Sequence, residues 1–203
     1  MTYKEANFKD EVIQGTDEVI AKTKHLKKGL IQELLAKGLI LGFMFDTNVF
    51  DAILDGSINL EQFPRNLKYY VTHIQYDEIC NIKNYVRRRE LLKIMEKVPN
   101  EVIAIEGAVY GISRYGMAKF MSDADAKQYD EMIRKLIEFD EKVGKKKPAE
   151  NQARDVLIAL TSIKNCLILV TEDKNLKKVT KEFIGQAITF EEFLEEFLLS
   201  ASP

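Results

Sequence analysis

Residues 39–50, LILGFMFDTNVF, decide the fold, because an apolar run here ends abruptly in polar side chains. Six of the first seven residues are apolar, and Gly42 is the one break. A short apolar run of this kind is typical of a strand buried on both faces of a parallel sheet. Ligands of open α/β sheets collect at the carboxyl ends of the strands, so we expect chemistry at Asp46. Asp is also a favoured N-cap, and this stretch alone is equally consistent with Asp46 capping the next helix.

Composition predicts a soluble globular protein in the cytoplasm. The chain has 203 residues, of which 46% are hydrophobic and 31% charged, which suits one well-packed domain. No apolar run approaches the roughly 20 residues of a membrane helix, and the polar N-terminus is unlike a signal peptide. Two cysteines without metal-ligand spacing and only two histidines leave carboxylates as metal ligands. Carboxylates favour a hard cation such as Mg²⁺ or Mn²⁺.

Strand and helix patterns alternate along the rest of the chain. Apolar runs predict strands at 40–45, 69–72, 102–105, 166–171 and 187–190. Helical spacing predicts helices at about 48–55, 74–97, 123–142, 149–165 and 174–183. The helix at 74–97 would bury Ile74, Ile79, Ile82, Val86, Leu92 and Met95. A capping box of Thr189 and Glu192 opens a final helix. The alternation predicts an α/β domain with a mainly parallel sheet.

A helical pattern also covers residues 3–37, ahead of the first strand. Its apolar stripe must bury against something, either the sheet or a second subunit. The sequence does not choose between these two, and the second would make the protein a homodimer.

Four acidic residues occupy equivalent places in this pattern. Asp46 closes the first strand and Asp173 follows the fourth, while Glu78 and Asp155 lie early in predicted helices. All four could project toward one edge of the sheet, whereas most of the 32 acids, Asp77 among them, are expected on solvated surface. Crowded carboxylates repel and desolvate one another, so the cluster is unfavourable unless a divalent cation fills it. Such a cluster is the signature of metal-assisted phosphoryl transfer or hydrolysis.

Three segments, in order, resemble the motifs of the PIN-domain ribonucleases, in particular the VapC-like toxin type. They are the DTN that begins at Asp46, the run THIQYDEI that contains Glu78, and the stretch RDVLIALTSIKNCLILVTED at 154–173. Asp155 and Asp173 are 18 positions apart (173 minus 155), the spacing of the toxin members. The resemblance covers about residues 39–190.

This resemblance implies a three-layer α/β/α fold with a five-stranded parallel sheet, and cleavage of RNA that depends on Mg²⁺ or Mn²⁺. The catalytic metal ligands would be Asp46, Glu78, Asp155 and Asp173, and the bound metal would lower the pKa of a coordinated water. Asn48 and Thr171 would orient these ligands by hydrogen bonds. Two regions depart from a minimal domain of the family: the N-terminal helical extension, 1–38, and a long helical insertion at about 107–148 within the nuclease domain, 39–203.

An acidic site repels RNA, so basic side chains must surround it. Phosphate contacts of this kind give affinity without sequence specificity. The candidates are Arg87, Arg88, Arg89, Lys145, Lys146, Lys147, Arg154, Lys174, Lys177 and Lys178. Each run taken singly is also typical of an ordinary solvated surface. Tyr110 and Tyr115 could stack on an unpaired base, although packing is the simpler expectation for both.

Other functions compete with the toxin hypothesis. An aspartate-nucleophile phosphatase would need a second aspartate two positions after Asp46, where the sequence has Asn48, which cannot donate a proton as an acid. An RNA-processing enzyme, or an RNA-binding module with an idle metal site, would share the fold without the toxin role. A toxin would have an antitoxin partner that covers the acidic cleft or offers it a cation. A nuclease assay with EDTA, followed by added Mn²⁺, separates the enzyme from the binding module.

Overall fold

The structure is a computed structural model that describes residues 42–56, 63 and 67–198. The chain divides into two units, Met1–Leu39 and Ile40–Pro203, and the fold below is that of the second. The predicted N-terminal helical extension lies outside the described residues, so it stays a prediction. Among the described helices, none has both the length and the apolar character needed to cross a membrane.

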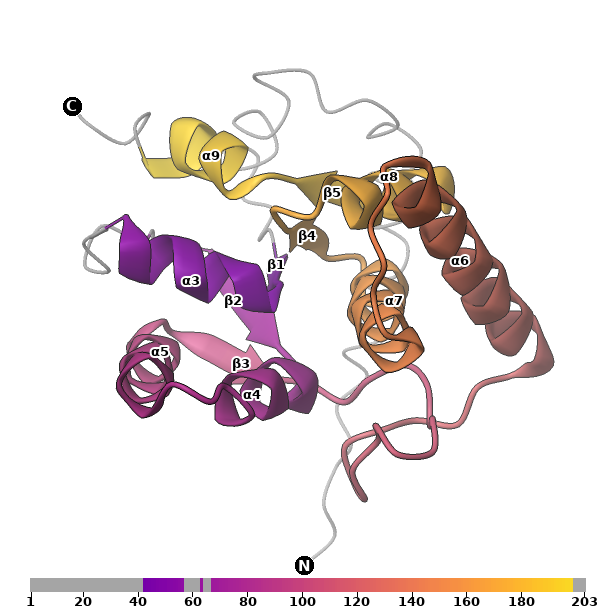
Figure 1. The fold of residues 1–203 in the computed structure, drawn as a ribbon, viewed down its shortest axis with the longest axis horizontal. Helices are drawn as coiled ribbons and strands as arrows, with labels where there is room; N and C mark the ends of the chain where they lie inside the picture. The colour runs from indigo at the N-terminus through magenta and orange to yellow at the C-terminus, as the bar shows by residue number, and fades with distance from the viewer. Residues whose placement is uncertain (1–41, 57–62, 64–66, 199–203) are drawn as a thin grey trace, which may run out of the picture. The chain divides into compact units, whose positions relative to one another are not determined.

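Five parallel strands form one sheet in the order β3-β2-β1-β4-β5 (Figure 1). The strands are β1 (Gly42–Phe45), β2 (Lys68–Val71), β3 (Asn100–Val102), β4 (Ile168–Val170) and β5 (Gln186–Ile188). In the centre Phe43 of β1 pairs with Tyr69 on one side and with Ile168 on the other. The predicted five-stranded parallel sheet is therefore confirmed.

The strand order reverses between β1 and β4, which are neighbours in the sheet. From β1 the chain continues to β2 and β3 on one side, and later returns to β4 and β5 on the other. In open α/β sheets ligands bind at the carboxyl ends of the strands at such a reversal. Asp46 and Thr171 are the residues that directly follow β1 and β4.

Helices cover both faces of the sheet, which makes the three layers that were predicted. They are α3 (Thr47–Asp55), α4 (His73–Cys80), α5 (Tyr85–Lys97), α6 (Asp123–Lys142), α7 (Ala149–Lys164), α8 (Lys174–Glu182) and α9 (Phe190–Phe193), which continues as a short π-helix, Leu194–Leu198. Right-handed crossovers put α3, α4 and α5 on one face and the group α6–α8 on the other. Figure 1 shows α3 and α5 apart from α6 and α7 accordingly.

The two faces of the sheet bury different side chains, because successive residues of a strand point to opposite faces. Phe43 and Phe45 of β1 face an aromatic cluster, in which Phe43 lies 5.2 Å from Phe193 and Phe45 lies 5.3 Å from Tyr69 between ring centroids. Met44, between them, joins the aliphatic core that α6 and α7 cover. Both clusters are fully buried around β1, so the strand that ends at Asp46 is held firmly from both sides.

The predicted helix at 74–97 is wrong, because the chain forms α4 and α5 with a break at 81–84. The side-chain oxygen of Asn84 accepts hydrogen bonds from the backbone of Val86 (3.0 Å) and Arg87 (3.1 Å), and this N-cap starts a new helix. The break also changes which residues face inward. Leu91 is fully buried, whereas Val86, predicted to be buried, is 54% exposed.

The third strand lies two residues earlier than predicted, at Asn100–Val102 instead of 102–105. Ile105 is buried outside this strand and forms an isolated bridge to Ala118. The apolar pattern of 102–105 correctly predicts that Ile105 is buried, but it does not predict where the hydrogen-bonded strand begins and ends. Within the predicted insertion, 107–148, the chain is irregular up to Ser122 and α6 supplies the helix.

Candidate active site

Asp46 caps a helix with one carboxylate oxygen and accepts side-chain hydrogen bonds with the other. It is the N-cap of α3, since its Oδ1 accepts from the backbone of Thr47 (2.8 Å). Its Oδ2 accepts from Asn48 Nδ2 (2.6 Å) and from Thr171 Oγ1 (2.6 Å). Only 4% of Asp46 is exposed. Burial raises the pKa of Asp46, and the nearby charge of Asp173 raises it further.

The end of β4 supplies a second acid next to Asp46. Asp173 is the N-cap of α8, where its Oδ1 accepts from the backbone of Asn175 (2.9 Å) and Leu176 (3.1 Å). Thr171 Oγ1 accepts from the backbone of Asp173 (3.0 Å) while it donates to Asp46. The side-chain oxygen of Asn48 accepts from the backbone of Glu172 (3.0 Å). Asn48 and Thr171 thus tie the ends of β1 and β4 together.

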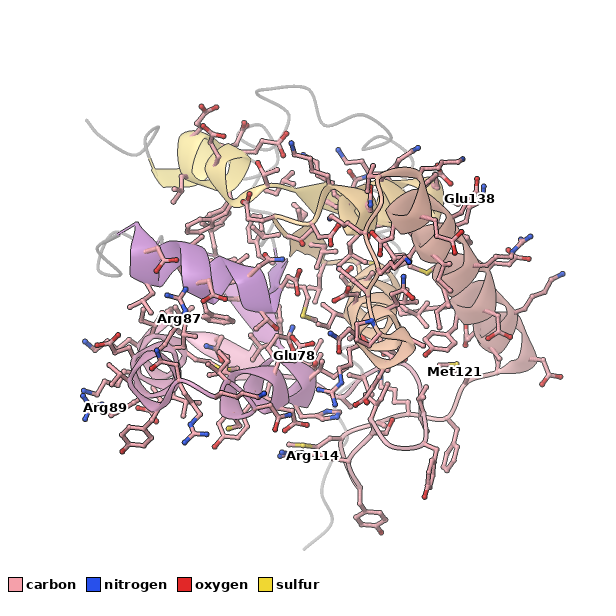
Figure 2. The ribbon with its side chains drawn as sticks, in the orientation of Figure 1. Glu78, Arg87, Arg89, Arg114, Met121 and Glu138 are labelled. Carbon is pink, nitrogen blue, oxygen red and sulfur yellow. The ribbon has the colours of Figure 1, made fainter. Side chains whose placement is uncertain are left out.

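Glu78 reaches the same site from α4, and Figure 2 shows it on the inner side of that helix. Thr47 Oγ1 donates a hydrogen bond to Glu78 Oε2. Burial raises the pKa of Glu78, and the charge of Asp46 adds to the rise. Asp77, its neighbour in sequence, instead pairs with Arg114. The two adjacent acids thus have different partners, and Asp77, which was expected on solvated surface, has a side chain that is only 17% exposed.

Gln75 fixes the position of α4 against the end of β1. Its side-chain nitrogen donates to the backbone oxygen of Phe45 (2.8 Å), and its side-chain oxygen accepts from the backbone of Thr72 (2.9 Å). Gln75 is fully buried. The two segments that carry Asp46 and Glu78 are therefore joined by a buried amide as well as by Thr47.

Asp155 is the fourth acid, and it enters the site from α7. Burial and the charge of Asp46, with a smaller contribution from Glu78, raise the pKa of Asp155 to about 7 against the opposing effect of Lys147. An acid is shifted this far when its neighbours carry like charge and water is largely excluded. The structure thus brings the four predicted acids close enough to act on one another.

Lys147 occupies a position that the sequence did not predict. Its Nζ lies 2.9 Å from Asp155 Oδ2 and 2.6 Å from Asp173 Oδ2. Although burial opposes the shift, this contact holds the pKa of Asp173 below its ordinary value and the pKa of Lys147 above its own. Lys147 was expected among the contacts to RNA, and the structure instead pairs it with two of the acids. The one signal in the sequence is the run of lysines eight positions ahead of Asp155.

The other predicted basic residues fall into two groups. Lys145, Lys146 and Lys174 are exposed, Lys174 directly follows Asp173 in the sequence, and Lys145 Nζ lies 3.7 Å from Asp173 Oδ2. Arg87 is paired with Asp51 and Asp55 between α3 and α5. Figure 2 shows Arg87 and Arg89 at α5, apart from Glu78. Only the first group borders the four acids directly.

Further basic side chains have local partners. The guanidinium of Arg88 donates to the backbone oxygen of Cys80 (3.2 Å), at the end of α4. Arg154 pairs with Glu150 (2.6 Å), and its charge also acts on Glu78. Lys177 pairs with Glu192, and the ammonium of Lys178 lies 3.7 Å from the ring centroid of Phe139. Arg154 is thus the one member of this group whose charge reaches an acid of the site.

Tyr110 and Tyr115 are both fully exposed, at 103% and 106%. The expectation that they pack against the protein is therefore wrong. Arg114, between them in sequence, is held to Asp77 of α4. The loop that carries the two rings is in this way attached to the helix that carries Glu78.

The donor set fits a hard divalent cation by its chemistry. Two of the four carboxylates pair with Lys147, and one of these two also lies near the exposed Lys145. Burial together with the charge of neighbouring acids raises the pKa of the other acids, Asp46 and Glu78, and of Asp155. In the described residues no three Asp, Glu, His or Cys side chains are arranged, as they stand, to hold a metal ion. Each acid instead accepts from a protein donor: Thr47, Asn48 and Thr171, the α8 backbone, or Lys147.

Comparison with solved structures returns several chains that are similar to this one at low sequence identity. PAE2754 from Pyrobaculum aerophilum is 17% identical with a TM-score of 0.48, over 81% of this chain and 100% of that one. VapBC2 from Rickettsia felis, bound to a DNA fragment from its promoter, is 18% identical with a TM-score of 0.43, over 73% and 98%. DNA-bound VapBC from Salmonella typhimurium is 15% identical with a TM-score of 0.43, over 74% and 98%.

Two of these three structures are VapBC structures. At this level of identity the likeness is one of fold. No family model and no curated protein matches the sequence.

Proposed function

We propose that this protein is a divalent-metal-dependent ribonuclease that hydrolyses RNA phosphodiester bonds at the four-carboxylate site, and that it is the toxin of a toxin–antitoxin pair. The observation that carries the proposal is the meeting of four acids from four separate segments at the point where the strand order reverses. Burial raises the pKa of Asp46, Glu78 and Asp155, and the charge of a neighbouring acid of the site adds to the rise in each case. An arrangement that is unfavourable for the fold itself is typical of a site whose chemistry requires it.

The residues that would hold Mg²⁺ or Mn²⁺ are Asp46, Glu78, Asp155 and Asp173. Such an ion would lower the pKa of a water molecule in the site, and it would neutralise negative charge that develops on the phosphate. Thr47 holds the carboxylate of Glu78, and Asn48 with Thr171 holds that of Asp46. These uncharged donors fix the direction in which the oxygens point without competing for the charge of a cation.

The exposed side chains around the site suit an RNA substrate. The exposed Lys145 and Lys174 border Asp173, and phosphate contacts from such lysines bind the backbone of any sequence. Tyr110 and Tyr115 project fully into solvent from a loop held against α4, where rings are able to stack on unpaired bases. We expect single-stranded RNA to be the better substrate for this reason.

The toxin role and its antitoxin partner rest on the matched VapBC structures. The phosphatase alternative has less support, because both ends of the Asn48 amide are engaged, one by Asp46 and one by the backbone of Glu172. An RNA-binding module with an idle site would keep the fold and the lysines, but it would not need all four acids.

The test is cleavage of a labelled single-stranded RNA by the full-length protein. We expect cleavage with Mg²⁺ or Mn²⁺, complete loss of cleavage in EDTA, and recovery when Mn²⁺ is added in excess. RNA that binds but stays intact under all these conditions would favour the binding module. Cleavage that persists unchanged in EDTA would remove the metal from the proposal.

A further inference from the structure

Lys147 lies in a short connection between α6 and α7 that is held at both ends. Gly144 has a φ of +73°, a backbone conformation that turns the chain sharply where α6 ends. The backbone of Lys145 donates to the backbone oxygen of Asp140 (2.8 Å), and Pro148 directly precedes α7. The connection therefore directs Lys147 toward the acids, while Lys145 and Lys146 stay exposed.

The contact made by Lys147 differs from an ordinary ion pair. One ammonium bridges two carboxylates that come from different helices, Asp155 of α7 and the N-cap of α8, Asp173. The side chain of Lys147 is 27% exposed, and those of the two acids are 15% and 11% exposed. A single positive charge thus lies between Asp155 and Asp173, two of the acids that would hold a divalent ion.

The charge balance shows why this lysine is replaceable. Lys147, with the exposed ammonium of Lys145 at 3.7 Å from Asp173, supplies fewer positive charges than the four acids supply negative ones. The acids of the group therefore still repel one another. A divalent ion between the same oxygens would neutralise twice the charge at similar distances, so it is favoured over an ammonium. A lysine also has a flexible four-carbon stem and three donors, which let its head move to a new acceptor nearby.

We infer that Lys147 is the exchangeable cation of this site: it neutralises Asp155 and Asp173 before a divalent ion arrives, gives way to that ion, and then binds the phosphate of the RNA next to it. This inference rests on the proposed function. It assigns to Lys147 two effects of opposite sign, since the lysine opposes the binding of metal and promotes the binding of RNA. A lysine that only stabilised the fold would have neither effect.

The first test is the affinity of the full-length, metal-free protein for Mn²⁺, measured from free Mn²⁺ by electron paramagnetic resonance. We expect Lys147→Gln to bind Mn²⁺ about tenfold more tightly than wild type, because the competing charge is gone. The matched control is Lys146→Gln, the same change at the exposed neighbouring lysine, for which we expect less than a twofold change. Equal or weaker Mn²⁺ binding by Lys147→Gln overturns the inference.

The second test is RNA cleavage at saturating Mn²⁺, where the competition for metal no longer matters. Lys147→Gln should raise KM for RNA about tenfold. Lys147→Arg, which keeps the charge, should have a KM close to that of wild type. A KM that is unchanged in Lys147→Gln contradicts the proposed phosphate contact. Lys147→Arg also preserves the ion pair, so it serves as the folded reference if the glutamine variant proves unstable.

The two proposals fail in different ways. If neither wild type nor Lys147→Gln binds Mn²⁺, the carboxylates are not a metal site, and the proposed function falls together with the exchange. If both proteins bind Mn²⁺ with equal affinity, the metal site stands and only the role of Lys147 is wrong.

Discussion

In two places in this molecule one basic side chain pairs with two carboxylates. The two groups of charged side chains differ in burial and in charge balance. On the surface, Arg87 of α5 pairs with Asp51 and Asp55 of α3, with side chains that are 37%, 37% and 62% exposed. At the sheet edge, Lys147 pairs with Asp155 and Asp173, whose side chains are no more than 15% exposed. Two further acids, Asp46 and Glu78, act on Asp155 as well.

The acids of the two groups differ in the direction of their pKa shifts. In the buried group Lys147 holds the pKa of Asp173 below its ordinary value although burial opposes this shift, whereas the other three acids are shifted upward. The hydrogen bond from Arg87 lowers the pKa of Asp55, as expected of a balanced pair in water. Burial raises the pKa of Asp46, Glu78 and Asp155, and none of them has enough neighbouring positive charge to reverse the effect. An ion pair as such therefore says little about function. A buried surplus of one charge indicates a cation or a substrate that completes the group.

Removing one acid from each group should give the largest contrast. We expect Asp46→Asn to lower the rate of RNA cleavage on the order of 1,000-fold, because the site loses a charge that no neighbouring group replaces. Asp51→Asn, in the surface group on the same helix, should cleave at a rate within about twofold of wild type. Circular dichroism of both variants checks that the fold is intact. Full activity in Asp46→Asn would falsify the assignment of the site.

In a pH series on the metal-free protein, Asp155 of the buried group and Asp55 of the surface group should change the stability of the fold in opposite directions as the pH rises. Asp155 has a pKa of about 7 in the folded protein and an ordinary value of 3.8. Between these values the native state holds a proton that the unfolded state has released, so this group lowers the free energy of unfolding as pH rises. The charged groups that act on Asp155 are Asp46 and Glu78, which raise its pKa, and Lys147, which lowers it.

Asp155→Asn removes this titration, so it should be more stable than wild type at pH 8, by several degrees in Tm. The difference should shrink steadily as the pH is lowered toward 4.5. Thermal unfolding in EDTA, monitored by circular dichroism, measures the Tm difference at pH 8 and its change with pH. A difference in Tm that is constant over this range, or that grows as the pH falls, contradicts the raised pKa.

The smallest effect should come from Asp55→Asn in the surface group. Its lowered pKa means that the carboxylate contributes stability above its ordinary value of 3.8 and loses it as the pH falls through its folded value. Because this ion pair is exposed to water, we expect Tm at pH 7 to drop by less than about 2 °C. The same measurement in 1 M NaCl should reduce the drop, since salt screens exposed pairs. A large loss of Tm would mean that the surface pair resembles the buried group more than its exposure indicates.

The sheet was predictable from sequence because burial on both faces leaves a strong local signal. Apolar runs end at Phe45 and at Val170, and the polar residues that follow them are the ones that meet at the reversal of strand order. The acids could be named for the same reason, since each sits at the end of a strand or early in a helix. Parallel topology then brings those positions to one edge without any further information.

What the sequence did not predict depends on contacts between distant residues or on competition within the backbone. Lys147 and Asp173 are 26 positions apart, and their contact depends on the direction in which the connection leaves α6. The break at 81–84 is local, but an Asn there is compatible with a helix until its side chain caps the next one. The exposure of Tyr110 contradicts the usual expectation for aromatic residues, and only its surroundings reveal it.

The amide of Gln75, which joins α4 to the last residue of β1, has a consequence for the precision of the site. This buried hydrogen bond fixes the distance between the backbone segments that carry Asp46 and Glu78, and it is shielded from water. Asp46 and Glu78 therefore behave as parts of a single rigid frame. Asp173 follows the neighbouring strand β4 and Asp155 comes from α7 on the other face of the sheet, so a cation bound by all four acids would join side chains from both faces.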